Sequence, residues 1–330
     1  MRAFPRPLLL ALIAALACTN AGETLSLPPL ATGTIGVGVY FDRDGSLTQS
    51  SLDTTVAGVR VALLAPTGQD TLRTATTNAS GFAVFDSVPI GSYRLVVDRK
   101  ALADSVGVVA GDTGIVRLIA STDSIKSSRV IRLGYLEVSL AAARLLPAGQ
   151  RVLVRGKVIS PLQAFRDSTA FLLDTSGTLR VTDARPRLGG NGNAIGDSVL
   201  VLGTTAEQAG QAVLSNGLFL TYGPGVAPLP QVVTVPDAIN ARGGGLDAAL
   251  VQLTSVVIRD TTSSGPDFIL KVADPAAPAV TVTVLIDQLL NAPRSIFSPG
   301  RTGTFRGVLV PQGDGTWVLK PRIPQDIILN

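Results

Sequence analysis

The sequence predicts an all-β protein built from several small domains. Val, Ile, Leu and Thr recur in short runs where apolar and polar residues alternate, which is the period of a strand with one buried face. The 34 Gly and 21 Pro separate these runs, and few stretches carry apolar residues at helical spacing. A chain of 330 residues also exceeds what one hydrophobic core usually organises, so we expect several domains of about 100 residues each.

The N-terminus carries an export signal. Arg2 and Arg6 form a short positive region, and residues 8–16 form an apolar run that is shorter than the roughly 20 residues needed to span a bilayer. The sequence ALAC at 15–18 resembles a bacterial lipobox, with Ala where Leu is commoner at the first position. The resemblance implies cleavage before Cys18 and lipidation of that cysteine, which would anchor the chain firmly. An ordinary signal peptide that contains Cys18 is the alternative.

We therefore assign residues 1–17 to the signal peptide and 18–33 to the lipidated cysteine and a tether. The tether is polar, contains proline and shows no periodicity. By resemblance to lipoproteins, the absence of Asp directly after the cysteine favours the outer membrane or cell surface over the inner membrane. Because Cys18 is the single cysteine, its modification would leave no thiol for disulfide or redox chemistry.

Residues 34–136 are expected to form a β-sandwich. Alternating runs occur at 37–41, 56–64, 71–77, 82–85 and 93–97. We expect Asn78 to Gly81 to join two of these strands as a hairpin turn, with Gly81 free to adopt a positive φ.

Three motifs of this domain, taken together, resemble the prealbumin-like sandwich. They are AGVRV at 57–61, TNASGFAVF at 77–85 and VPIGSYRL at 88–95. That family includes the B-type repeats of serine-aspartate-repeat adhesins, carboxypeptidase regulatory-like domains and starch-binding-like modules. The resemblance implies the fold but no ligand, because the motif residues are turn formers and core residues.

An acidic loop follows the first strand of this domain. The adhesin repeats hold calcium in a loop at this position, and here it contains Asp42, Asp44 and Asp53. Calcium prefers about six to eight oxygen ligands. Three carboxylates, the competing charge of Arg43 and the lack of Glu leave that set incomplete. We therefore expect a solvated loop with no metal and no cofactor, and calcium binding is the alternative.

Residues 137–330 contain an internal repeat of about 100 residues. A short helix capped by Ser139 and a strand at 150–159 are matched by a helix that starts at Pro236 and a strand at 249–258. Further matching pairs are 171–174 with 268–271 and 196–203 with 300–307. Each copy reads helix, strand, strand, turn, strand, turn, strand and closing strand. A closed five-stranded barrel of the OB type satisfies this order.

We expect one OB-like barrel over 137–230 and a second over 231–330. The repeat resembles the tandem OB-like modules found beside secreted bacterial nuclease and phosphatase domains. The residues that carry the resemblance are Ala143-Arg144, 154–158, Gly196-Asp197, 201–203, 319–322 and 326–327. Because no nuclease domain lies alongside, the resemblance implies no enzymatic role here.

The composition excludes several classes of enzyme. The chain has no His, which removes imidazole acid-base chemistry, Ser-His-Asp and Cys-His nucleophiles and nearly all zinc sites. It has neither a Gly-x-Ser-x-Gly elbow nor a Walker loop. Paired carboxylates would suffice for hydrolysis, but the acids fall mainly at turns, where capping explains them. Examples are Asp174, Asp197, Asp274 and Asp314. We expect no enzyme and no catalytic residue.

The charge distribution argues against a nucleic-acid partner. The formal net charge is only +4, and Arg and Asp are interspersed along the chain rather than gathered on one face. The aromatics of the barrels mostly alternate with polar neighbours, which favours core packing over a base-stacking surface. They are Phe171, Phe219, Phe268, Phe305 and Trp317.

Two further groups of residues are candidate ligand sites. Arg180, Arg185 and Arg187 begin a glycine-rich loop that would suit an anionic sugar or phosphate, with a solvated loop as the alternative. Tyr93 and Trp317 are the candidates for an aromatic platform beneath a sugar. The sequence thus predicts a non-catalytic envelope lipoprotein that binds a glycan or envelope protein, or acts as a spacer. Nucleic-acid binding through the tandem barrels is the alternative.

Overall fold

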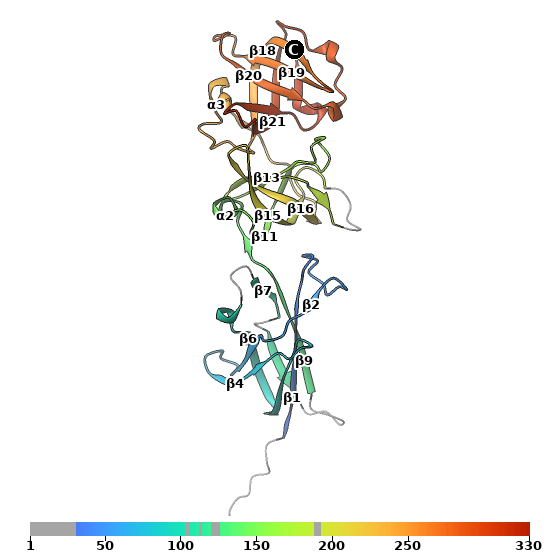
Figure 1. Cartoon of the computed structure of the whole chain (residues 1–330), viewed down its shortest axis with the longest axis vertical. Coiled ribbons are helices and arrows are strands. Elements are labelled where there is room, and N and C mark those ends of the chain that lie inside the picture. The colour runs from blue at the N-terminus through green and yellow to red at the C-terminus, as the bar shows by residue number, and fades with distance from the viewer. Residues whose placement is uncertain (1–30, 103–105, 112–113, 120–125, 188–192) are drawn as a thin grey trace, which may run out of the picture.

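The chain forms three β units that follow one another along its long axis, with the C-terminus in the unit farthest from the strand β1 (Thr32–Phe41) (Figure 1). This computed structural model describes residues 31–102, 106–111, 114–119, 126–187 and 193–330. The signal peptide and Cys18 lie outside the described residues. Within the described residues, no helix is both long and apolar enough for a membrane span. The predicted all-β fold is confirmed.

The first unit is a sandwich of two sheets. Its elements are β1 (Thr32–Phe41), β2 (Thr54–Thr55), β3 (Arg60–Leu64), β4 (Thr71–Thr76), β5 (Phe82–Pro89), β6 (Gly91–Val97), the 3-10 helix η1 (Arg99–Ala101), β7 (Val106–Ala110), β8 (Ile115–Leu118) and β9 (Lys126–Tyr135). In one sheet, β1 pairs with β2, β5 and, in parallel, β9, which also pairs with β7. The other sheet has the order β4-β3-β6-β8. Alternate side chains such as Val37, Leu63 and Leu95 meet between the sheets in a dry core.

The turn at Asn78 to Gly81 is tight, but it does not make a hairpin. Gly81 has the expected positive φ of 74°, and the Asn78 amide donates to the Phe82 carbonyl at 2.8 Å. However, β4 pairs with β3 in one sheet and β5 pairs with β1 in the other. The hairpin prediction is therefore wrong, because turn residues determine the local bend and not the sheet that the next strand joins.

The second unit is a closed barrel. Its elements are β10 (Glu137–Val138), α2 (Leu140–Leu145), β11 (Arg151–Ser160), β12 (Ala170–Asp174), β13 (Gly177–Val181), β14 (Arg185–Pro186), β15 (Ser198–Gln208) and β16 (Gln211–Gly223). The pairing runs β11-β12-β13-β16-β15 and returns to β11, which closes five strands into a ring. The β13–β16 pair is parallel, so the fourth strand is inserted between the first and the fifth, as the OB order requires.

The third unit repeats this topology. Its elements are β17 (Gln231–Val232), α3 (Val235–Ile239), β18 (Leu250–Ser264), β19 (Asp267–Ala273), β20 (Thr281–Ile286), η2 (Gln288–Leu290), η3 (Arg294–Ile296), β21 (Thr302–Pro311), β22 (Trp317–Lys320), η4 (Pro324–Asp326) and β23 (Ile327–Leu329). The ring runs β18-β19-β20-β22-β21 and returns to β18. The edge strand β17 pairs in parallel with β18, as β10 does with β11. The prediction of two five-stranded barrels is confirmed.

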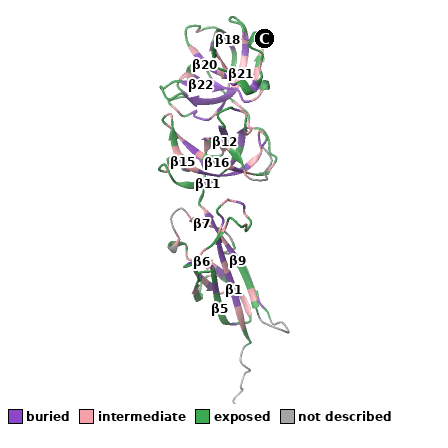
Figure 2. Ribbon diagram, turned by 45° about the vertical axis from the view of Figure 1, so that its right-hand side comes forward, coloured by how far each residue is buried: buried purple, intermediate pink, exposed green. Residues whose placement is uncertain are grey.

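The short helices begin at polar caps. Ser139 caps α2 as expected, since its hydroxyl accepts from the Ala142 amide at 3.2 Å. Thr234 caps α3 and exchanges two hydrogen bonds with Asp237 in a capping box. Each helix packs apolar residues such as Leu140 and Val235 against its barrel, whose inward-facing strand residues are buried (Figure 2).

The two barrels meet through an apolar interface. Ile159, Phe165 and Phe171 of the first barrel join Leu250 and Val308 of the second in one buried cluster. The rings of Phe165 and Phe171 meet edge to face at 5.7 Å. The two barrels therefore share one apolar cluster at their interface.

A buried ion pair closes the interface between the barrels. Arg322 pairs with Asp326 at 2.9 Å and donates from Nη1 to the Ile159 carbonyl of the other barrel at 2.6 Å. Both charged side chains are almost fully buried, at 6% and 3% exposed. The guanidinium therefore ties the end of the second barrel to the first.

Candidate functional site

The three carboxylates of the acidic loop come together between β1 and β2. Asp42, Asp44 and Asp53 each bring one oxygen within 4.8 Å of the other two. Asp42 is only 2% exposed, so this part of the loop is not the solvated segment expected from the sequence. Such close packing of like charges needs compensation by hydrogen bonds or by cations.

Backbone amides supply part of that compensation. Asp42 accepts from the Ser46 amide at 2.9 Å and from the Leu47 amide at 2.8 Å. Asp53 accepts from the amides of Arg43 at 3.1 Å and Ser50 at 2.7 Å. The loop therefore wraps around its own carboxylates, which fixes their positions.

The spacing of the loop matches a known calcium geometry. An EF-hand loop of about 12 residues takes ligands from positions 1, 3, 5, 7, 9 and 12, and the sharp turn at position 6 is made by Gly. Counted from Asp42, those ligand positions are Asp42, Asp44, Ser46, Thr48, Ser50 and Asp53. Leu47 stands at the sixth position with a φ of 66°, the left-handed conformation that Gly adopts there. Ser46, Thr48 and Ser50 were not predicted as ligands from the sequence, because only carboxylates were counted there and not the spacing.

The pKa values of Asp42 and Asp44 are shifted in opposite directions. Burial raises the pKa of the Asp42 carboxyl, and the amides of Leu47 and Ser46 only partly oppose it. For Asp44, burial would also raise the pKa, but hydrogen bonds from Ser46 and the charge of Arg187 bring it below the usual value. Of Asp42 and Asp44, Asp42 is thus the carboxyl that more strongly favours a proton.

An ion pair links this cluster to the first barrel. Arg187 Nη2 lies 2.9 Å from Asp44 Oδ2, and Arg132 Nε lies 4.0 Å from Asp42 Oδ2. Arg187 follows β14 of the barrel, whereas Arg132 lies on β9 of the sandwich. The acidic loop therefore contributes to the junction between the two units.

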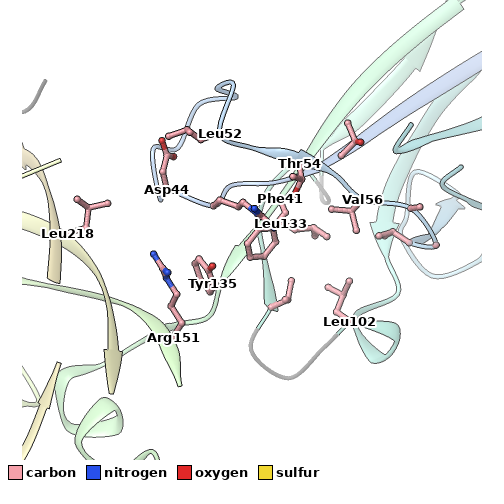
Figure 3. Close-up of a pocket in the computed structure, with 16 residues that line it drawn as sticks. Phe41, Asp44, Leu52, Thr54, Val56, Leu102, Leu133, Tyr135, Arg151 and Leu218 are labelled. Atoms are coloured by element: carbon pink, nitrogen blue, oxygen red, sulfur yellow. The ribbon is translucent and has the colours of Figure 1, made fainter. Parts of the chain in front are cut away.

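A groove of about 880 Å³ lies beside this junction (Figure 3). Phe41, Leu133 and Tyr135 form an apolar wall on the sandwich, and Arg151 and Leu218 approach from the barrel. The Arg151 guanidinium lies over the Tyr135 ring at 5.2 Å, so a cation-π contact spans the groove.

The three arginines predicted as one ligand loop have different surroundings. Arg180 is 4% exposed and donates to the Gln208 carbonyl at 2.8 Å, whereas Arg187 pairs with Asp44. Arg185 is exposed on β14. Residues 188–192 of the loop lie outside the described residues. Neighbours in sequence thus do not form one cationic patch, because strand pairing directs them to different faces.

The aromatic platform predicted at Tyr93 and Trp317 is wrong. Each ring is only 8% exposed, and the Tyr93 hydroxyl donates to the Pro89 carbonyl at 2.6 Å. Both side chains pack into the cores of their units, as strand alternation with one buried face requires. Phe171, Phe219 and Phe305 are also buried, which confirms core packing for these three.

The acids at the turns have the capping role expected for them. Asp174, Asp197, Asp274 and Asp314 each accept a hydrogen bond from a nearby backbone amide, at 2.7 to 2.9 Å. Such bonds satisfy turn amides that have no strand partner.

The OB surface that binds oligonucleotides in other proteins is covered in the first barrel. That surface lies on the second and third strands and the loops beside them. Here Phe171 of β12 is fully buried in the cluster between the barrels. The second barrel therefore occupies part of this surface.

Comparison with known proteins identifies one part of the chain. Residues 33–114 match the family model of the SdrD B-like domain, which supports the adhesin B-type, prealbumin-like fold of the sandwich. No curated protein matches the chain.

Three bacterial pilus proteins are among the solved structures that the chain resembles. The pilus 2b backbone protein of group B streptococcus is 16% identical over 32% of this chain and 41% of its own, less than half of that protein, with a TM-score of 0.24. The major pilin subunit of Bacillus cereus is 9% identical over 91% and 95%, with a TM-score of 0.26. The minor pilin of Streptococcus agalactiae is 16% identical over 62% and 100%, with a TM-score of 0.22. Scores this low do not establish a shared overall architecture.

Proposed function

We propose that this protein is a non-catalytic spacer of the cell surface, which holds its C-terminal barrel away from the membrane. The observation that carries the proposal is the linear arrangement of the three units, with the sandwich at one end and the C-terminus in the barrel at the other end (Figure 1). A lipid on Cys18 would anchor the end that bears the sandwich. The match of the sandwich to the SdrD B-like domain supports a role as a surface module.

A spacer keeps its length only if its junctions resist bending. Between the barrels, the buried cluster and the Arg322–Asp326 pair provide that resistance. Between the sandwich and the first barrel, β9 ends at Tyr135 and β10 begins at Glu137, so the connection is very short. The pair formed by Arg187 and Asp44 adds a second link across the same junction.

We further propose that calcium binds the Asp42–Asp53 loop and rigidifies that loop. The loop offers only oxygen ligands, which calcium prefers, and its carboxylates already converge within 4.8 Å. Arg187 and Arg132 stand beside the same carboxylates. Calcium would therefore compete with these guanidinium groups for Asp44 and Asp42.

A glycan or an envelope protein remains the proposed partner class, bound on the exposed surface of the sandwich or the second barrel. Nucleic acid is less well supported, because the second barrel covers part of the oligonucleotide-binding surface of the first.

The test of the anchor and the spacer uses the full chain with a C-terminal epitope, expressed in a bacterium that processes lipoproteins. Intact cells should bind an antibody against the epitope, and the protein should fractionate with membranes. Cys18→Ala should release it from the membrane fraction, and Cys18→Ser serves as a second variant without a thiol. An epitope that is reached only after cell lysis would contradict the proposal.

A further inference from the structure

A second, polar pocket of about 400 Å³ lies between the two barrels. Arg180 and Gln208 line it from the first barrel, and Gln312 and Lys320 line it from the second. Since both barrels contribute walls, the pocket exists only where the tandem pair is assembled. It lies apart from the acidic loop and the groove beside it, whose lining residues are different.

Arg180 brings an uncompensated charge to this pocket. The side chain is 4% exposed, and its Nη2 donates to the Gln208 carbonyl at 2.8 Å, but its Nε has no hydrogen-bond partner. Among the described residues no carboxylate lies within ion-pair distance of this guanidinium. Burial lowers the pKa of Arg180, and the more distant Asp247 and Asp167 oppose that shift. A buried guanidinium in this state favours an anionic oxygen beside it.

Lys320 provides a second buried cation, but it is already paired. It is 5% exposed, and its Nζ lies 2.9 Å from Asp167 Oδ2 and 4.4 Å from the centre of the Phe165 ring. Burial would raise the pKa of Asp167, but the charge of Lys320 and its hydrogen bonds lower it, so the carboxylate stays ionised. In this pocket, Arg180 is thus a cationic group without a carboxylate partner, and Asp167 is an ionised acceptor.

The rest of the lining is suited to hydroxyl groups. Thr169, Thr182 and Asp183 line the pocket together with Gln208 and Gln312. Such groups donate to and accept from hydroxyls, whereas a purely anionic ligand would use few of them.

We propose that the pocket between the barrels binds a small hydroxylated acid, such as a sugar acid. Its carboxylate would accept from Arg180 Nε, and its hydroxyls would bond to the polar lining and to Asp167. A sugar phosphate shares this chemistry, so both are tested. The proposal does not depend on the spacer role or on calcium.

The test is isothermal titration of the purified full chain with glucuronate, glucose 6-phosphate, glucose and inorganic phosphate. Glucuronate or glucose 6-phosphate should bind at least tenfold more tightly than glucose or inorganic phosphate. Arg180→Gln should weaken that binding at least tenfold, while the exposed Arg185→Gln should leave it unchanged. Equal affinity for glucose would refute the role of Arg180, and equal affinity for inorganic phosphate would refute the hydroxylated class. No binding of any probe at millimolar concentration would overturn the proposal.

A substitution at an exposed position tests the same site without disturbing the core. Gln312 is exposed at the rim of the pocket, so Gln312→Ala should fold normally and weaken binding of the preferred acid several-fold. Arg180→Lys keeps the charge but removes the Nε donor, and should also weaken binding. Unchanged affinity in both variants, with unaltered circular dichroism, would contradict the assigned site.

Discussion

Replacement of Arg322 by Met should destabilise the contact between the two barrels. The substitution removes the bonds from Nε and Nη2 to Asp326, each 2.9 Å, and the bond from Nη1 to the Ile159 carbonyl at 2.6 Å. It leaves a carboxylate that is 3% exposed without its cation. Breaking one side of a buried pair typically costs about 3–5 kcal/mol, so we expect a loss in that range. The loss should appear in the unfolding of the second barrel and weaken its coupling to the first.

The assay is equilibrium denaturation followed by tryptophan fluorescence. Trp317 is the single tryptophan and lies in the core of the second barrel, so its signal reports on that unit. Arg242→Met is the control, because its pair with Asp237 at 3.2 Å is exposed and should not change the unfolding midpoint. The double variant Arg322→Met/Asp326→Leu should recover part of the loss, since it removes the uncompensated charge. A loss below about 1 kcal/mol for Arg322→Met would refute this account of the interface.

Three further predictions concern the sandwich and its junction. In Gly81→Ala, the new Cβ would lie 2.6 Å from a backbone oxygen, whereas in Gly58→Ala it would meet nothing within 4 Å. Both positions have a positive φ, so Gly58→Ala should lower the free energy of unfolding by about 1–2 kcal/mol in thermal unfolding. Gly81→Ala should cost clearly more. Because the pKa of Asp42 is raised in the folded state, its contribution to stability is present at low pH and is lost as pH rises through that pKa. In thermal scans without divalent ions, Asp42→Asn should therefore flatten the dependence of the melting temperature on pH. Arg187→Ala should tighten calcium binding in titration calorimetry, because it frees Asp44, while reducing stability by no more than about 1 kcal/mol; equal affinity would contradict the competition.

The repeated barrels were predictable because their signal is periodic. The strand at 150–159 and its match at 249–258 both became first strands of closed rings, and the Ser139 cap was recognisable from local chemistry. Local rules of this kind depend on neighbouring residues alone. The hairpin at Asn78 failed for the opposite reason, because the partner of a strand depends on residues far away in the sequence.

The functional residues were harder to predict, because their roles depend on contacts between units. Arg187 lies 143 residues from Asp44 in sequence, and no local pattern relates the two. Arg180 was predicted to belong to a ligand loop, but it is buried beside the pocket between the barrels. The acidic loop is different, because the spacing from Asp42 to Asp53 was visible in the sequence. The proposed calcium site also uses hydroxyl and carbonyl oxygens, which a count of carboxylates leaves out.

Small-angle X-ray scattering of the purified chain without residues 1–21 tests the central claim most directly. The account predicts an elongated particle whose scattering curve agrees with the end-to-end arrangement of the three units (Figure 1). A compact particle, or a curve that only a flexibly linked sandwich and barrel pair can fit, would contradict the spacer.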